Sequence, residues 1–150
     1  MNNLKKSMVI LMADDDDDDF FLTLEALEES RLRHILLRVK NGEELLDYLL
    51  RRGSYAEAAT SPRPTLILLD LNMPKMDGRE ALKQIKSHPD LRRIPVVVLT
   101  TSSAAEDIVK TYDLGVNSFI RKPVCFDEFL KTIQVLTEYW LEIVTLPAEE

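Results

Sequence analysis

The chain has 150 residues, of which 45% are hydrophobic and 30% charged, with a formal net charge of −7. This length predicts one domain with a single core, and no apolar run approaches the roughly 18 residues of a membrane span. The 26 acidic residues outnumber the 19 basic ones mainly because six of them form one run, Asp14 to Asp19. The sequence has no basic stripe of the kind that indicates nucleic-acid binding. No signal-peptide pattern precedes the first apolar run. With one cysteine and two histidines, we expect no disulfide, no histidine-rich metal site and a reduced, cytoplasmic setting.

Three short apolar runs are nearly continuous, as in strands that are buried on both faces: Met8–Ala13, Thr65–Asp70 and Pro95–Thr100. Two weaker runs, His34–Val39 and Asn117–Ile120, fit the same role. Five strands are therefore expected.

Segments with the period of amphipathic helices separate these runs. We expect helices around residues 20–27, 41–49, 78–85, 104–114 and 126–144. Asn41 with Glu44 resembles a capping pair at the start of the second helix, and Gly115 ends the fourth. The alternation of five strands with five helices predicts an α/β fold, a parallel sheet with helices on both faces.

Polar side chains follow the predicted strands at one edge of this sheet, where ligands of open parallel sheets bind. Asp14 and Asp15 follow the first strand, Asp70 ends the third, Thr100 ends the fourth and Lys122 follows the fifth. Carboxylates suit a divalent cation, whereas the hydroxyl and the ammonium group suit phosphoryl oxygens. A central aspartate can itself be the nucleophile and form an acyl phosphate.

Each of these residues also has a purely structural interpretation. A lone Asp70 would be a strand-end cap, and Thr100 an ordinary strand residue, so their roles depend on the whole set. The acids at 16–18 are predicted to form a solvated loop, with Asp19 as the cap of the first helix. Alternatively, their charges strengthen the attraction of the site for a metal ion or repel anionic phosphodonors. The run is not a calcium-binding EF-hand, because Asp19 stands where that loop needs glycine. Cys125 is expected to be a small core residue.

Four motifs in this order and spacing resemble the receiver domain of two-component response regulators. They are ILMADD (10–15), LLDLNMP (68–74) with Asp77–Gly78, VLTT (98–101) and FIRKP (119–123). The resemblance implies a flavodoxin-like sheet with strand order 2-1-3-4-5. It covers a core of about residues 8–135 within a single domain, 1–150, and leaves a C-terminal extension at 136–150.

The resemblance also implies residue roles. Asp70 would accept the phosphoryl group. Mg²⁺ (or Mn²⁺) would be bound by Asp14, Asp15, Asp70 and the backbone carbonyl of Asn72. Lys122 would contact the phosphoryl oxygens.

Three further expectations concern the conformational switch of this family. Thr100 would supply the switch hydroxyl, and Phe119 would be the aromatic residue that turns inward on activation. The Lys122–Pro123 peptide bond would be cis.

The long segment before the third strand (53–64) and the extended C-terminus look like those of single-domain receivers that partner bacterial phytochromes, especially cyanobacterial ones. By itself the segment is predicted to be a surface loop with one helical turn. The apolar residues at the end of the last helix exceed one face, so they either cap the core or form an interface with a partner or a second copy, next to the fourth and fifth helices. The interface candidates are Tyr139, Trp140, Leu141 and Val144.

These expectations describe a cytoplasmic signalling protein, not an enzyme with its own substrate. A sensor histidine kinase, with a phytochrome as one candidate, would phosphorylate Asp70 and thereby switch the protein-binding surface. One alternative is a receiver-like docking module that works without phosphorylation. The other is a hydrolase with an aspartyl-phosphate intermediate, although such enzymes place an acid–base Asp where this chain has Asn72.

Overall fold

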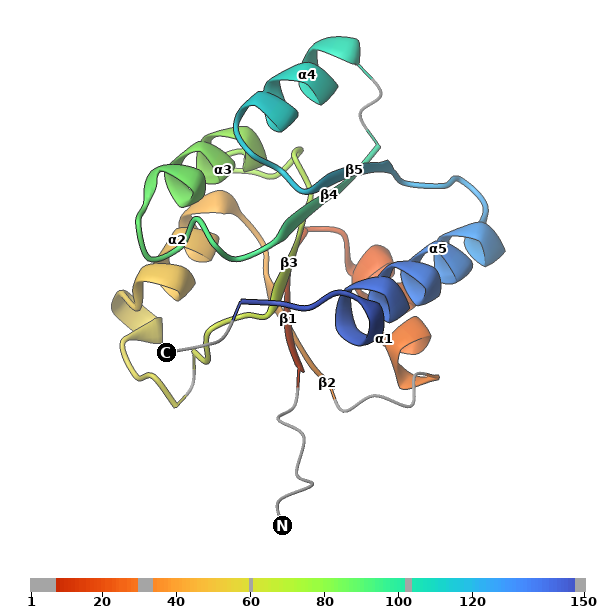
Figure 1. Ribbon diagram of the computed structural model, residues 1–150, viewed down its shortest axis with the longest axis horizontal. Helices are drawn as coiled ribbons and strands as arrows, with labels where there is room; N and C mark the ends of the chain where they lie inside the picture. The colour runs from red at the N-terminus through yellow and green to blue at the C-terminus, as the bar shows by residue number, and fades with distance from the viewer. Residues whose placement is uncertain (1–7, 30–33, 60, 102–103, 148–150) are drawn as a thin grey trace.

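A computed structural model describes residues 8–29, 34–59, 61–101 and 104–147. Five parallel strands form one sheet in the order β2-β1-β3-β4-β5, which confirms the predicted flavodoxin-like topology. The strands are β1 (Met8–Ala13), β2 (His34–Val39), β3 (Leu66–Leu69), β4 (Val96–Thr100) and β5 (Ser118–Arg121). Helices lie on both sides of this sheet, as Figure 1 shows.

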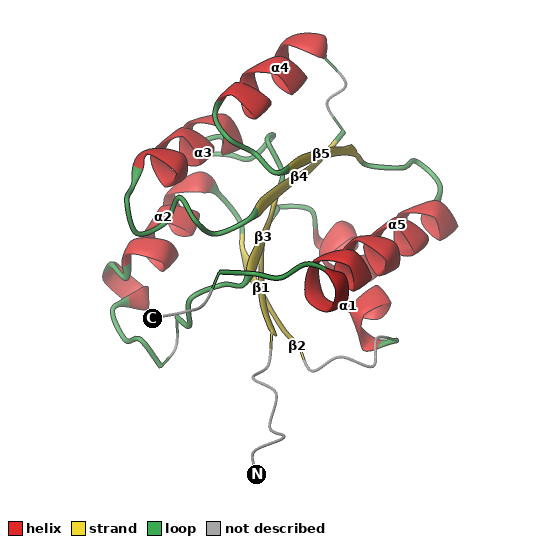
Figure 2. Ribbon diagram, viewed as in Figure 1, coloured by secondary structure: helices red, strands yellow, loops and turns green. Residues whose placement is uncertain are grey.

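The helices are α1 (Asp17–Glu28), α2 (Gly42–Leu50), α3 (Gly78–Ser87), α4 (Ala105–Asp113) and α5 (Phe126–Glu138). In Figure 2, α1 and α5 cover one face of the sheet, whereas α2, α3 and α4 lie on the other side. The central strands are buried on both faces because alternate side chains enter two separate cores. On β1, for example, Leu11 packs with α2 and α3, whereas Ile10 and Met12 pack with α1 and α5.

The segment between α2 and β3 contains one 3₁₀ turn, Gly53–Tyr55, as predicted. Partly buried hydrogen bonds attach this segment to α2. The Tyr48 hydroxyl donates to the Pro62 carbonyl at 2.6 Å, and the Tyr55 hydroxyl donates to Glu44 at 2.6 Å. The loop is therefore fixed against the second helix.

The last helix is shorter than predicted. It ends at Glu138 and continues as a π-helical turn, Tyr139–Ile143, closed by a hydrogen bond from the Val144 N–H to the Tyr139 carbonyl. This turn places Trp140 and Leu141 in the α1–α5 core and leaves Tyr139 exposed. None of the described helices is long and apolar enough to cross a membrane.

Two sequence-based expectations about single residues are wrong. The cap of α1 is Asp16, whose side chain accepts the Asp19 N–H, so the helix begins three residues earlier than an Asp19 cap would require. Cys125 is exposed, because it immediately precedes α5 on the surface and does not point into the core.

Candidate functional site

The acidic pair lies at the carboxyl end of β1. The backbone N–H of Asp14 donates to the Val39 carbonyl at 3.0 Å, which continues the β1–β2 pairing by one residue. Asp14 is only 1% exposed, whereas Asp15 lies in solvent. The Asp14 carboxylate also accepts the Asp16 N–H at 2.9 Å, so the loop that begins the aspartate run is ordered by its first member.

Asp70 follows β3 directly and is buried beside this pair. Its backbone N–H donates to the Ala13 carbonyl at 2.9 Å. One carboxylate oxygen, Oδ1, accepts the Thr100 hydroxyl at 2.9 Å and the Asn72 N–H at 3.1 Å. The side-chain amide of Asn72 lies 3.4 Å from the Thr100 hydroxyl. The ends of β1, β3 and β4 therefore bring their polar residues together as the sequence predicted.

Asp14, Asp15 and Asp70 form a group that could hold a metal ion. One ligand atom from each lies within 4.8 Å of the others. Three carboxylate oxygens at this separation match the preference of hard divalent cations such as Mg²⁺ and Mn²⁺. Asn72 lies two residues after Asp70 in the same loop, at the position predicted to offer its carbonyl.

Lys122 reaches into the same group from the end of β5. Its ammonium nitrogen, Nζ, lies 2.8 Å from Asp14 Oδ2 and 3.2 Å from Asp70 Oδ2. Asp19 makes the shortest of these contacts, at 2.6 Å from Nζ. Sequence reasoning missed Asp19 as a partner of the lysine and assigned it to a helix cap. Asp19 lies three residues after Asp16, the cap of α1, and therefore in the first helical turn beside the site. This spacing was the signal that could have identified Asp19.

The electrostatics of the site follow from burial and from the excess of carboxylates over ammonium groups. Burial raises the pKa of Asp14 to about 6, although Lys122 acts in the opposite direction. Burial acts to lower the pKa of Lys122, but the carboxylates of Asp14, Asp19 and Asp70 outweigh burial and raise it above its ordinary value. Lys122 is therefore a permanent cation, whereas burial makes the Asp14 carboxylate easier to protonate than an ordinary aspartate.

Arg38, on β2, supports the loop from the other side and was not predicted. Its Nε donates to the Asp14 carbonyl at 3.0 Å, and its Nη1 donates to Asp17 at 2.7 Å. The guanidinium also stacks over the Phe20 ring, 5.1 Å from the ring centroid. Arg38 holds the pKa of the Asp17 carboxyl below its usual range. The sequence signal that could have identified Arg38 was a basic residue near the carboxyl end of β2, the strand that neighbours β1.

The two predicted switch residues lie near each other on adjacent strands. Thr100 is fully buried and its hydroxyl donates to Asp70. Phe119 is partly buried and packs against the α2–α3 core, and its backbone N–H donates to the Tyr112 hydroxyl. In this structure the Phe119 ring therefore already contacts the core; its movement on activation remains a prediction.

The predicted cis bond is not present. The described residues contain no cis peptide bond, so Lys122–Pro123 is trans. The trans form of such a bond is intrinsically favoured by about 0.5–1 kcal/mol, and the Lys122 side chain reaches Asp14 and Asp70 without the cis isomer.

The four interface candidates separate into two groups. Trp140 and Leu141 are mostly buried in the core of the monomer, which favours the core-capping interpretation for them. Tyr139 is 50% exposed, and Val144 is partly buried. Tyr139 lines an open apolar groove of about 590 Å³ between β5 and α5, together with Ile120 and Val135.

Comparison with known proteins agrees with this geometry. The response regulator receiver domain family matches residues 10–134. The chain belongs to this family. Response regulator Rcp1 of Synechocystis sp. is 46% identical over 127 residues, which cover 85% of this chain and 84% of Rcp1.

Solved receiver structures are also similar to this one. The phosphorylated cyanobacterial phytochrome response regulator RcpA superposes with a TM-score of 0.91 at 44% identity, over 95% of this chain and all of RcpA. The Mn²⁺-bound form of Rcp1 gives a TM-score of 0.89 at 45% identity, over 94% of this chain and 99% of Rcp1. This receiver is thus homologous to phytochrome-associated response regulators, and its aspartate group suits a divalent metal.

Proposed function

We propose that this receiver accepts a phosphoryl group on Asp70 from the phosphohistidine of a sensor histidine kinase. The observation that carries the proposal is the convergence of Asp14, Asp15, Thr100 and Lys122 on one buried carboxylate. An oxygen of Asp70 attacks phosphorus, the bond between phosphorus and the histidine nitrogen breaks, and the nitrogen keeps its electron pair.

The residues of the site have separate tasks in this transfer. Asp14, Asp15, Asp70 and the Asn72 carbonyl would hold Mg²⁺, which offsets the negative charge of the transferring group. Lys122, which contacts both Asp14 and Asp70, contributes a fixed positive charge beside the transferring group. Once Asp70 is an acyl phosphate, its Oδ1 is no longer a carboxylate oxygen for the Thr100 hydroxyl, and the hydroxyl is free to donate to the phosphoryl group.

A sensor kinase of the phytochrome class is the partner we propose, within a cytoplasmic phosphorelay. Support comes from the homology to RcpA and from a bacteriophytochrome response regulator that matches 97% of this chain at 42% identity. The protein is a signalling phosphoacceptor and catalyses only its own phosphotransfer and dephosphorylation. We assign it neither nucleic acid nor a membrane as a partner.

We also propose that the face formed by α4, β5 and α5 is the surface that phosphorylation switches, with a second copy of this chain as occupant. The groove beside Tyr139 and the exposed Val135 supply apolar area there. Light scattering should show a larger dimer fraction for the phosphorylated parent chain than for phosphorylated Val135→Gln. A parent chain that stays monomeric when phosphorylated would contradict a homodimer.

The first test of the main proposal is intact mass after incubation with acetyl phosphate and Mg²⁺. We expect the mass of one phosphoryl group to be added, and none to be added to Asp70→Asn or without metal. Label on Asp70→Asn would contradict the proposal. No gain together with no metal binding would favour the docking module, whereas steady release of phosphate from small esters would favour the hydrolase.

A further inference from the structure

A second hollow lies at the end of the sheet opposite to Asp70. It has a volume of about 540 Å³, within the range of small-molecule sites. Thr65 and Pro95, which immediately precede β3 and β4, line it, so it opens at the amino ends of these strands. The C-terminal segment forms one wall through Leu146 and Pro147.

Three arginines from three separate segments line this hollow: Arg51 after α2, Arg63 before β3 and Arg93 before β4. None of them forms an ion pair with a described residue. One carboxylate, Asp90, is the acid among the lining residues. The hollow therefore carries excess positive charge in a chain whose net charge is −7.

Backbone carbonyls hold two of these arginines in place. Arg63 Nη1 donates to the Leu49 carbonyl at 3.0 Å, and Arg51 Nε donates to the Ser61 carbonyl at 3.4 Å. Both guanidinium groups act on the Tyr48 hydroxyl, where they oppose the burial that raises its pKa to about 12. Each arginine thus keeps further N–H donors for a ligand, and little side-chain entropy is lost on binding.

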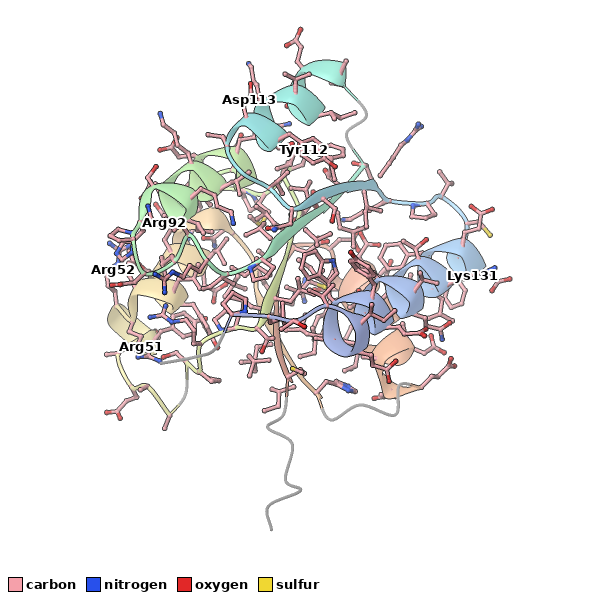
Figure 3. The ribbon with its side chains drawn as sticks, in the orientation of Figure 1. Arg51, Arg52, Arg92, Tyr112, Asp113 and Lys131 are labelled. Atoms are coloured by element: carbon pink, nitrogen blue, oxygen red, sulfur yellow. The ribbon has the colours of Figure 1, made fainter. Side chains whose placement is uncertain are left out.

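The loop that carries Arg93 is also fixed. The Lys86 ammonium donates to the carbonyls of Arg92 and Ile94, both at 3.1 Å, and burial lowers its pKa. Figure 3 shows Arg51, Arg52 and Arg92 gathered on one side of the molecule, near the end of α2. Neither Arg52 nor Arg92 lines the hollow, and Arg52 is paired with Asp47 at 3.2 Å. The positive lining charge therefore comes from Arg51, Arg63 and Arg93.

We propose that this hollow binds a small phosphate-bearing molecule with at least two negative charges. Guanidinium groups match phosphate oxygens in geometry and remain charged at any physiological pH. The excess of positive lining charge favours a ligand that is more than singly charged. Pro64, Ile94 and Leu146 supply an apolar wall against which the organic part of a nucleotide-sized ligand would pack. The site is separate from the aspartate group, which lies beyond the carboxyl ends of β1 and β3.

Binding of ADP, measured by equilibrium dialysis in EDTA, tests this proposal without metal at the aspartates. We expect one saturable site, weakened at least tenfold in Arg51→Gln/Arg93→Gln. Lys83→Gln/Lys110→Gln removes the same charge from the exposed faces of α3 and α4 and should bind ADP like the parent chain. Asp70→Asn should also bind normally, which separates this site from the phosphoacceptor. Unchanged thermal unfolding of the ligand-free variants serves as the folding control.

Three outcomes would overturn the proposal. The first is no saturable ADP binding to the parent chain. The second is an equal loss of affinity in the two double variants, which would indicate a general effect of charge. The third concerns Glu149 and Glu150, which follow Pro147 in the sequence. ADP binding that appears only after both are changed to Gln would mean that the chain's own carboxylates occupy the arginines.

Discussion

Three carboxylates share the ammonium group of Lys122, and the contact with Asp19 is the shortest of them. Asp14 and Asp70 belong to the proposed metal group, whereas Asp19 does not. Asp19 contacts the site through the lysine, and it competes with an incoming phosphoryl group for the same cation. This competition sets the first prediction.

Asp19→Asn should increase the rate of phosphorylation by acetyl phosphate about two- to fivefold, because the net worth of one partly exposed ion pair is up to about 1 kcal/mol. The rate would be followed by intact mass at fixed Mg²⁺. Asp18→Asn is the matched control, since Asp18 is exposed in the same run. An equal acceleration in both variants would mean that the net charge of the run matters and the contact with Lys122 does not.

The raised pKa of Asp14 predicts that metal binding depends on pH. A cation binds the ionised carboxylate, so protonation of Asp14 at its pKa of about 6 competes with the metal. The dissociation constant for Mg²⁺ should rise about tenfold from pH 7 to pH 5. Titration calorimetry at both pH values would measure it. In Asp14→Asn the affinity should be lower throughout, and a tenfold dependence that persists there would assign the titration to another group.

At the scale of elements, two helices begin with a glycine for the same steric reason. A Cβ on Gly42 would lie 2.2 Å from the Met76 carbonyl oxygen, and one on Gly78 would lie 2.3 Å from the Asp70 carbonyl oxygen. The N–H groups of these glycines donate to the Met76 and Leu71 carbonyls, both at 2.9 Å. Close backbone approach thus couples the starts of α2 and α3 to the loop that follows Asp70.

Gly78→Ala should lower the free energy of unfolding by about 2–3 kcal/mol, because the new methyl group meets backbone that cannot move without displacing Asp70. Urea unfolding would measure this loss. Gly53→Ala is the comparison: its site is open, and the positive φ of 57° makes alanine unfavourable by about 1 kcal/mol. If Gly78→Ala loses no more stability than Gly53→Ala, the close approach of backbone does not explain the glycine at position 78.

For the whole molecule, a bound cation should stabilise the fold because it binds the native aspartate group and not the unfolded chain. Mg²⁺ at 100 times its dissociation constant should add about 2.7 kcal/mol to the free energy of unfolding. Trp140, the only tryptophan, is mostly buried and reports unfolding by fluorescence. Asp15→Asn should lose most of this gain. A gain that is unchanged in Asp15→Asn would place the ion elsewhere.

Sequence patterns were sufficient for the sheet, because continuous apolar runs with five intervening helices leave few topologies and the polar strand ends then meet at one edge. Side-chain partners were harder. Asp16, Asp19 and Arg38 depend on where a helix begins and on which strand lies beside β1, and neither is visible in local composition. The π-helical turn after Glu138 escaped prediction because its apolar pattern also fits a continuing α-helix.

The positions of the two charged sites along the strands have an electrical consequence. The aspartates lie beyond the carboxyl ends of β1 and β3, whereas the arginine-lined hollow opens at the amino ends of β3 and β4. The charges of these two described sites therefore form an electric dipole roughly parallel to the strands. At low ionic strength such a dipole orients the protein before contact, so a positively charged partner surface would meet the Asp70 edge first and a negatively charged one the opposite edge.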